Sequence, residues 1–216
     1  MNKQDVVARI REIGLVPVVR AQSPEEAATA IDAIRAGGVP ILEITMTVPG
    51  AVGLIEALSR RFGDEALVGA GTVLDPETAR AVMLAGARFV VSPSLNVDTI
   101  ACCHRYGVAV FPGALTPTEV VTAWQAGADM VKVFPAGNVG GASYIKALKA
   151  PLPQVELIPT GGVSLKTAGE FIKAGASALG VGADLVDLKA VREGRVAELT
   201  ERARQFVEIV RQARLG

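Results

Sequence analysis

The sequence has very few of the residues that build disulfide scaffolds or histidine-rich sites. Its 216 residues include two cysteines and one histidine, and the three are consecutive, Cys102, Cys103 and His104. A disulfide between adjacent cysteines would be strained, and two thiolates without a nearby partner do not make a metal site. We therefore expect half-buried, reduced thiols and a histidine with a satisfied hydrogen bond, and a histidine-rich metal site is excluded.

The sequence also lacks an excess of charge of either sign, because 22 Lys and Arg residues balance 22 Asp and Glu residues. Without a basic field, the expected partner is a small molecule and neither a nucleic acid nor a membrane. The residues after Met1, Asn2-Lys3-Gln4-Asp5, are polar, and no apolar run approaches a membrane-spanning length. These features predict a soluble, cytoplasmic protein.

Aromatic residues make up only 4% of the chain, although half of its residues are hydrophobic. Ala, Val, Ile and Leu dominate, which is typical of α/β proteins whose helices pack on parallel strands buried on both faces. Short β-branched runs alternate with longer helical patterns along the chain. The expected strands are Val16–Arg20, Ile41–Met46, Leu67–Ala70, Phe89–Ser92, Val108–Phe111, Met130–Phe134, Glu156–Pro159 and Ala178–Val181.

Helix starts follow several of these strands. Ser23-Pro24-Glu25-Glu26, Asp75-Pro76-Glu77 and Thr116-Pro117-Thr118-Glu119 each combine a capping side chain, a proline at the first helical position and an early acid. The first dozen residues predict an additional amphipathic helix, and residues 191–214 predict a long final helix. No linker or change of composition divides the chain.

Eight β/α units in one domain, residues 1–216, predict a single (β/α)₈ TIM barrel with an extra N-terminal helix. An open, doubly wound sheet also alternates strands and helices, so periodicity alone leaves it as an alternative. The number of units favours the barrel. The turn after the first strand, Arg20-Ala21-Gln22-Ser23, also lacks the glycines of a dinucleotide-binding loop.

Two charged residues interrupt apolar strands. Lys132 lies in Met130-Val131-Lys132-Val133-Phe134, and Glu43 lies in Ile41-Leu42-Glu43-Ile44. Burial disfavours the ammonium form of a lysine and yields a neutral amine that can attack a ketone, and a nearby carboxylate can carry protons. The alternative is a purely structural ion pair across the barrel interior. We favour the catalytic interpretation.

Two glycine-rich turns follow the last two predicted strands. These are Thr160-Gly161-Gly162-Val163 and Gly180-Val181-Gly182-Ala183. The corresponding loops of such barrels often hold a phosphate, because glycines expose backbone N–H groups and a helix N-terminus adds a favourable dipole. Each turn alone could be only a tight connection, but together they favour a phosphorylated ligand.

Two further residues lie at the ends of predicted strands, where barrel enzymes place their active sites. Thr72, in the turn Gly69-Ala70-Gly71-Thr72, can offer its hydroxyl to a carboxylate or a carbonyl. Arg20 can hold a carboxylate through two hydrogen bonds, with a surface salt bridge as the alternative.

Several motifs give the chain, over essentially its full length, a resemblance to the 2-keto-3-deoxy-6-phosphogluconate aldolases, also called 4-hydroxy-2-oxoglutarate aldolases. The motifs are Val16-Pro17-Val18-Val19-Arg20, Leu42-Glu43-Ile44-Thr45, Gly69-Ala70-Gly71-Thr72-Val73-Leu74, Val91-Ser92-Pro93, Lys132-Val133-Phe134-Pro135 and Pro159-Thr160-Gly161-Gly162-Val163.

This resemblance implies a homotrimeric class I aldolase that needs no metal or other cofactor, with Lys132 as the Schiff-base lysine and Glu43 as the proton shuttle. It also implies that Thr72 and Pro93 line the pyruvyl part of the substrate and that Phe134 packs beside the Schiff base. By the same resemblance, the amides of Gly161, Gly162, Gly182 and Ala183 bind phosphate.

Two positions depart from the pattern of the best-known members of that family. Thr47 stands where they have an arginine for the carboxylate, so Arg20 is expected to take over that contact. Ala183 stands where they have a serine, so the last phosphate loop lacks a hydroxyl. The same chemistry on the galactonate epimer, or on 4-hydroxy-2-oxoglutarate, therefore remains open. A phosphosugar isomerase-type barrel and a non-catalytic phosphate-binding barrel are alternatives of a different class.

Overall fold

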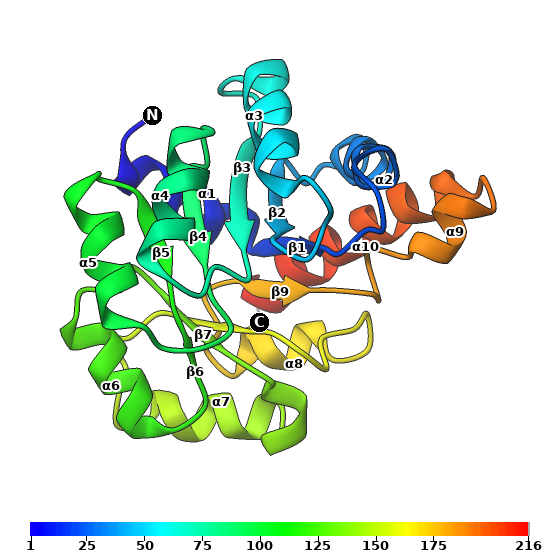
Figure 1. Ribbon diagram of the computed structural model, residues 1–216. Helices are drawn as coiled ribbons and strands as arrows, with labels where there is room; N and C mark the ends of the chain where they lie inside the picture. Colours follow the sequence, from blue (N-terminus) through cyan, green and yellow to red (C-terminus); the bar gives the residue numbers. More distant parts are fainter. Residues whose placement is uncertain (216) are drawn as a thin grey trace.

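The structure, a computed structural model, describes residues 1–215 and alternates helices with parallel strands along the chain (Figure 1). The strands are β1 (Leu15–Val19), β2 (Ile41–Thr45), β3 (Leu67–Gly71), β4 (Phe89–Val91), β5 (Ala109–Phe111), β6 (Gly113–Ala114), β7 (Val131–Val133), β8 (Leu157–Pro159) and β9 (Leu179–Val181). The helices are α1 (Lys3–Ile13), α2 (Pro24–Ala36), α3 (Ala51–Phe62), α4 (Pro76–Leu84), α5 (Val97–Arg105), α6 (Pro117–Gln125), the 3₁₀ helix η1 (Ala136–Val139), α7 (Ala142–Lys149), α8 (Ala168–Lys173), α9 (Leu188–Arg192) and α10 (Val196–Leu215).

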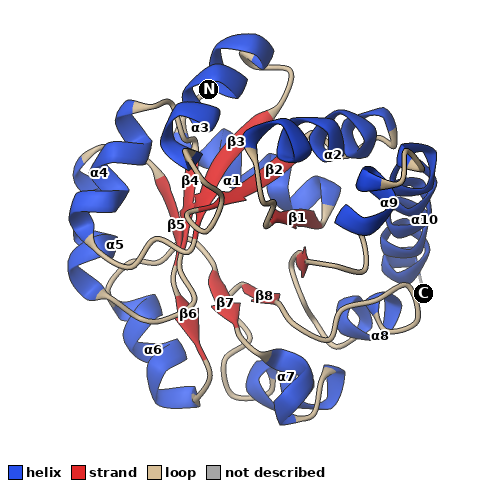
Figure 2. Ribbon diagram, turned by 45° about the vertical axis from the view of Figure 1, so that its right-hand side comes forward, coloured by secondary structure: helices blue, strands red, loops and turns tan. Residues whose placement is uncertain are grey.

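All of the strand pairs are parallel, and neighbours along the chain are neighbours in the sheet. One set of strands has the order β5-β4-β3-β2-β1-β9, and a second has the order β6-β7-β8. A single bridge between Thr160 and Gly180 joins the end of β8 to β9. The sheet curls around a common centre, and the helices other than α1 lie outside it (Figure 2).

The open, doubly wound alternative is wrong. A doubly wound sheet reverses its strand order near the middle. Here the first strand, β1, pairs with β2 on one side and with the last strand, β9, on the other. The predicted strand Val108–Phe111 is confirmed as β5, and a further short strand, β6, follows Pro112, which has no N–H to donate.

Alternate residues of each strand point to opposite sides of the curled sheet. Those on the outer side, such as Leu42 and Ile44, join the large apolar cluster beneath the helices. Those on the inner side near the strand starts form a second cluster, and Val6 and Ile10 of α1 pack into it. The strand members of this inner cluster are Val16, Ile41, Leu67, Phe89, Val91, Ala109, Phe111, Met130, Ile158 and Ala178.

The predicted helix starts are confirmed. Ser23, Asp75 and Thr116 are the N-caps of α2, α4 and α6, and each side chain accepts a backbone N–H from the first turn. The predicted final helix over residues 191–214 is wrong in extent. Gly194, with a φ of +74°, separates α9 from α10, so the long helix begins only at Val196.

The two cysteines are more buried than predicted. Both are free, and burial raises the pKa of the Cys103 thiol to about 12. His104 is exposed, and its Nε2 donates to the carbonyl of Gly127 over 2.6 Å, as a satisfied histidine should. None of the helices in residues 1–215 combines the length and the apolar character needed to cross a membrane.

Candidate active site

Lys132 lies at the centre of β7 and is almost completely buried. It pairs with Gly113 of β6 and Ile158 of β8, and it is 3% exposed. Its strand neighbours Val131 and Val133 belong to the outer apolar cluster, so alternation directs Lys132 to the inner side. A lone buried ammonium is costly, and such a lysine therefore requires a nearby acid or a catalytic use.

Glu43, on the inner side of β2, is the acid that faces Lys132. Its carboxylate is 2% exposed, and Oε1 lies 3.9 Å from Lys132 Nζ. Burial raises the pKa of the Glu43 carboxyl, and the positive charges of Lys132 and Arg20 oppose this effect more weakly. The fold thus joins two charges that are 89 residues apart in the sequence, 132 minus 43, and leaves the acid well suited to exchange protons.

Phe134 and Pro93 lie close to this pair. Lys132 Nζ is 5.3 Å from the centroid of the Phe134 ring. Pro93 packs on the backbone of Gly113, the register partner of Lys132, so closely that a methyl group on Gly113 would lie 2.2 Å from the Pro93 carbonyl carbon. The structure therefore places Phe134 beside the lysine and Pro93 against the glycine that pairs with it.

Thr72, directly after β3, has a strained backbone. Its φ of +58° is the only positive φ of a non-glycine residue within residues 1–215. A β-branched residue in this conformation costs about 1–3 kcal/mol, and such strain concentrates at functional sites. The neighbouring Val73 N–H, which donates to the carbonyl of Val91, helps to hold the turn.

The predicted phosphate loops line one small cavity at the carboxyl ends of the strands. The cavity has a volume of about 230 Å³. Of the predicted site residues, Arg20, Phe134, Gly161, Gly162, Gly182 and Ala183 line it. Gly161 and Gly162 have φ values of +86° and +77°, which is why this turn requires glycine.

Arg20, directly after β1, lies close to the glycine turn that follows β9. A methyl group on Gly182 would be 3.9 Å from Arg20 Nη1, so the guanidinium reaches the turn after β9. A second cavity of about 280 Å³ shares Arg20, Gly182 and Ala183 with the first and extends toward Lys189. The only strong cation of the smaller cavity thus lies among the backbone groups predicted to bind phosphate.

Neither of the last two glycine turns leads directly into a helix. Helix α8 begins at Ala168 and α9 at Leu188, each several residues after its glycine turn. The first two residues of α9, Leu188 and Lys189, nevertheless line the adjoining cavity of about 280 Å³. Backbone N–H groups of the turns themselves, together with Arg20, are what the cavity offers to an anion.

Thr47 does not offer its hydroxyl freely. The Thr45 hydroxyl donates to the carbonyl of Val19 over 3.0 Å, and Thr47 Oγ1 lies 2.6 Å from Thr45 Oγ1. Because Thr45 has used its one hydrogen, Thr47 is the donor of the second bond. This chain of hydroxyls ties the end of β2 to the end of β1, directly before Arg20.

Two cavity residues with polar side chains were not singled out from the sequence. Thr160, which is buried, entered the prediction only as the first residue of a glycine turn, and Asp184 did not enter it at all. Asp184 accepts the backbone N–H of Leu165 and so joins the two turns. An inward position two residues beyond Ile158 was the available signal for Thr160, whereas no pattern marked Asp184.

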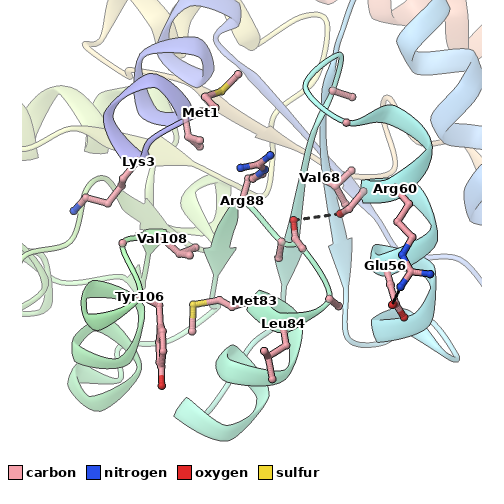
Figure 3. Close-up of a pocket in the computed structure, with 18 of the residues that line it drawn as sticks. Met1, Lys3, Glu56, Arg60, Val68, Met83, Leu84, Arg88, Tyr106 and Val108 are labelled. Carbon is pink, nitrogen blue, oxygen red and sulfur yellow. Dashed lines mark hydrogen bonds and ion pairs between the residues drawn. The ribbon is translucent and has the colours of Figure 1, made fainter.

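A larger cavity, of about 520 Å³, lies at the opposite ends of the strands (Figure 3). It is lined by Met1 and Lys3 from the chain start, Met83 and Leu84 at the end of α4, and Tyr106 after α5. Its charged side chains are already paired, as in the Arg60–Glu56, Arg88–Asp64 and Lys3–Asp129 ion pairs. It includes neither Lys132 nor Glu43, so cavity size does not identify the site in this molecule.

Within residues 1–215, no three His, Cys, Asp or Glu side chains lie close enough together to hold a metal ion.

A family model of aldolases, described as KDPG and KHG aldolase, matches residues 6–202. The chain belongs to this family. A 2-dehydro-3-deoxy-6-phosphogalactonate aldolase of Escherichia coli (strain K12) is 36% identical over 204 residues, which cover 94% of this chain and 97% of the relative. A 2-dehydro-3-deoxy-phosphogluconate aldolase of Treponema pallidum (strain Nichols) is 33% identical over 93% of this chain and 95% of the relative.

Solved structures of the same family superpose on this aldolase fold. The KDPG aldolase of Legionella pneumophila, with pyruvate captured at low pH as a covalent carbinolamine intermediate, has a TM-score of 0.85 and 30% identity. The match covers 92% of this chain and 96% of that one. A 3-hexulose-6-phosphate synthase of Salmonella typhimurium, at 20% identity and a TM-score of 0.75, shares the fold. Family membership thus selects the aldolase interpretation over the isomerase-type one.

Proposed function

We propose that this family member is a class I aldolase that cleaves 2-keto-3-deoxy-6-phosphogluconate to pyruvate and glyceraldehyde 3-phosphate through a Schiff base on Lys132. The observation that carries the proposal is the pairing of two buried groups, Lys132 Nζ and Glu43 Oε1, at 3.9 Å. A buried amine is the nucleophile that a Schiff-base enzyme needs, and a buried acid is the proton carrier.

The proposed reaction uses these two side chains and water. The Lys132 amine attacks the C2 ketone, Glu43 helps to expel water, and the resulting protonated imine accepts electrons. Loss of the C4 hydroxyl proton then breaks the C3–C4 bond and releases the aldehyde. The remaining enamine takes a proton at C3, and hydrolysis frees pyruvate and the amine.

The other site residues receive roles according to their positions. Thr72 and Pro93 would line the pyruvyl part, and Phe134 would exclude water beside the imine. Backbone amides of the turns Gly161–Gly162 and Gly182–Ala183 would bind the phosphate.

The position of Arg20 against Gly182 supports a phosphate contact for it more strongly than the carboxylate contact predicted from the sequence. A guanidinium in that place would supply the charge-assisted hydrogen bonds that the missing Ala183 hydroxyl does not. The carboxylate would then rest on Thr72, whose strained backbone directs this turn at the site.

A second candidate substrate is the galactonate epimer, since the Escherichia coli relative at 36% identity is named for it. Cleavage rates on the gluconate and galactonate compounds, and on unphosphorylated 4-hydroxy-2-oxoglutarate, distinguish the three. A strong preference for the phosphorylated compounds is expected. Equal turnover of hydroxyoxoglutarate would contradict the phosphate site.

We also propose that the strands form one closed (β/α)₈ barrel, with β5 and β6 as two halves of its fifth strand and α1 covering the strand starts. Two contacts support closure where the sheet is interrupted. The bridge Thr160–Gly180 joins the end of β8 to β9. The Lys132 N–H of β7 donates over 2.9 Å to the carbonyl of Pro112, which lies between β5 and β6. The packing of Val6 and Ile10 in the inner cluster supports the place of α1. A homotrimer in the cytoplasm, free of metal and other cofactors, remains our prediction, and sedimentation analysis tests the oligomer.

The experiment that tests the function is intact-protein mass spectrometry after incubation with pyruvate and borohydride. Wild type and Lys146→Ala, which removes an exposed lysine on α7, should both gain a reduced pyruvyl adduct, whereas Lys132→Ala should not. Absence of an adduct on wild type at saturating pyruvate would contradict the Schiff-base assignment and favour the isomerase-type or the non-catalytic barrel.

A further inference from the structure

Strand β3 has two glycines on its inner side, and backbone conformation requires neither of them. Gly69 is the register partner of Glu43, and Gly71 is the partner of Thr45. Both lie in regular strand, and neither has a positive φ. Glycine weakens a strand relative to residues with side chains, so its presence here calls for a reason in the surrounding packing.

The space left by each glycine is occupied by a specific side chain. A methyl group on Gly69 would lie 2.4 Å from the ring of Phe89, in the apolar cluster. A methyl group on Gly71 would lie 2.0 Å from Glu43 Oε1 and 2.7 Å from both Cδ and Cγ. The first glycine accommodates packing, and the second accommodates the carboxylate of the proposed proton shuttle.

The Glu43 carboxylate fills this space without a hydrogen bond from a described residue to its Oε1. Within residues 1–215 no donor contacts its buried Oε1, and the amine of Lys132 is 3.9 Å away. A carboxylate oxygen without a fixed donor is free to accept a proton from a bound substrate or water. Its position, however, then depends on the surfaces around it, and Gly71 is one of these.

We propose that Gly71 is a positioning residue for proton transfer: its missing side chain leaves the space that holds the Glu43 carboxylate beside the Lys132 imine. This inference rests on the proposed function. A methyl group at Gly71 displaces the carboxylate but leaves Lys132 and the anion cavity in place. Gly71→Ala should therefore impair proton transfer far more than formation of the pyruvate adduct.

Exchange of the pyruvate methyl protons with deuterium isolates this step. Exchange begins with the step from imine to enamine, in which Glu43 takes a proton from the methyl carbon of the bound pyruvate imine. The C–H electron pair becomes the enamine double bond, and the π pair of the C=N⁺ bond moves onto nitrogen. The carboxyl group then exchanges its proton with D₂O and returns a deuteron to carbon by the reverse route, so no oxidant or further reactant is needed.

The test compares wild type, Gly71→Ala, Glu43→Gln and Gly71→Ala/Glu43→Gln in pyruvate exchange, measured by NMR in D₂O. The extent of the borohydride-trapped adduct at long incubation is measured in parallel. Gly53→Ala, on the exposed side of α3 where an added methyl group meets nothing within 4 Å, is the matched control. Gly71→Ala should slow exchange at least tenfold, shift its pH profile, and reach nearly the wild-type extent of adduct.

The double variant decides whether Gly71 acts through Glu43. In the Glu43→Gln background, Gly71→Ala should change exchange less than twofold, because the affected carboxylate is already gone. An equal slowing in both backgrounds, or wild-type exchange by Gly71→Ala, would overturn the proposal. Failure of the proposed function looks different, because wild type itself would then form no adduct.

Should Gly71→Ala be insoluble, Gly71→Ala/Glu43→Asp provides the second test. Aspartate is one methylene shorter, so its carboxylate withdraws from the added methyl group. Recovery of soluble protein with a higher thermal midpoint would support the contact between residues 71 and 43, whereas a double variant that is equally insoluble would overturn it.

Discussion

The two ends of the inner sheet surface are built from opposite kinds of residue. Near the strand starts, side chains such as Ile41, Leu67 and Phe89 fill the interior, and α1 adds Val6. Two residues further along β2, the inner position is Glu43, followed by Thr45. Beside Thr45 on β3 lies Gly71, which leaves room for the Glu43 carboxylate. The difference shows that one end fills space for stability, whereas the other leaves space and tolerates buried charge for chemistry.

The largest expected effect comes from opening the filled end. Phe89 is fully buried and its ring packs 5.7 Å from that of Phe111. Phe89→Ala should lower the free energy of unfolding by about 3–5 kcal/mol, through lost burial and a cavity. Urea denaturation followed by circular dichroism measures it. Leu84→Ala is the control, because this side chain is 70% exposed, and it should change stability by less than about 0.5 kcal/mol. If both variants lost the same free energy of unfolding, the filled end would not have the stabilising role assigned to it.

Apolar side chains at Lys132 and Glu43 should leave the free energy of unfolding unchanged or raise it, whereas Phe89→Ala should lower it. Lys132→Met/Glu43→Leu replaces a buried ion pair, and such replacements are neutral or stabilise proteins by about 1–4 kcal/mol. The double variant should form no pyruvate adduct while unfolding at equal or higher urea concentration than wild type. Glu43→Leu alone serves as the control, because it leaves Lys132 buried and unpaired and should destabilise. A destabilised double variant would contradict the expected cost of burying these two charges.

The raised pKa of Glu43 gives stability a pH dependence. Since the folded protein binds this proton more tightly than the unfolded chain, the stabilisation is fully present below the ordinary glutamate pKa, about 4.3. It is lost as the pH rises through the raised folded value. The unfolding free energy of wild type relative to Glu43→Gln should therefore fall over that window in urea titrations. A difference that is constant with pH would contradict the assigned direction.

Arg20 tests the role of charge at the rim of the open end. Arg20→Gln should raise KM for the phosphorylated substrate about tenfold, equivalent to about 1.4 kcal/mol of lost binding. Adduct formation with pyruvate, which has no phosphate, should stay unchanged. Steady-state kinetics measures the first and mass spectrometry the second. Lys189→Gln is the control, because Lys189 lines only the adjoining cavity. If Lys189→Gln raised KM as much as Arg20→Gln, the loss of positive charge in general, and not a contact of Arg20 with the phosphate, would explain the result.

The smallest effect should come from a helix cap outside both regions. Ser23 accepts the Glu26 N–H over 3.2 Å at the start of α2. Ser23→Ala should cost about 1 kcal/mol of stability and leave kcat unaltered. Thr29→Ala, in the same helix but away from its cap, is the control in urea denaturation. A loss of kcat would mean that α2 influences the site.

The sequence by itself determined the elements and the two central residues. Capping residues at Ser23, Asp75 and Thr116 define helix starts through local hydrogen bonds. Lys132 and Glu43 were found because a charge inside an apolar parallel strand must be paired or used. Both signals are local, and so a single sequence contains them.

Only the tertiary structure decided which residues from different strands lie next to one another. The position of Arg20 among the phosphate loops, the hydroxyl chain that occupies Thr47 and the fit of Gly71 to the Glu43 carboxylate each depend on strand register. Periodicity shows which side of a strand a residue is on, but not what lies opposite or how far away it is. That information exists only once neighbouring strands are paired and the sheet is curled, because contacts between residues distant in sequence are set by packing.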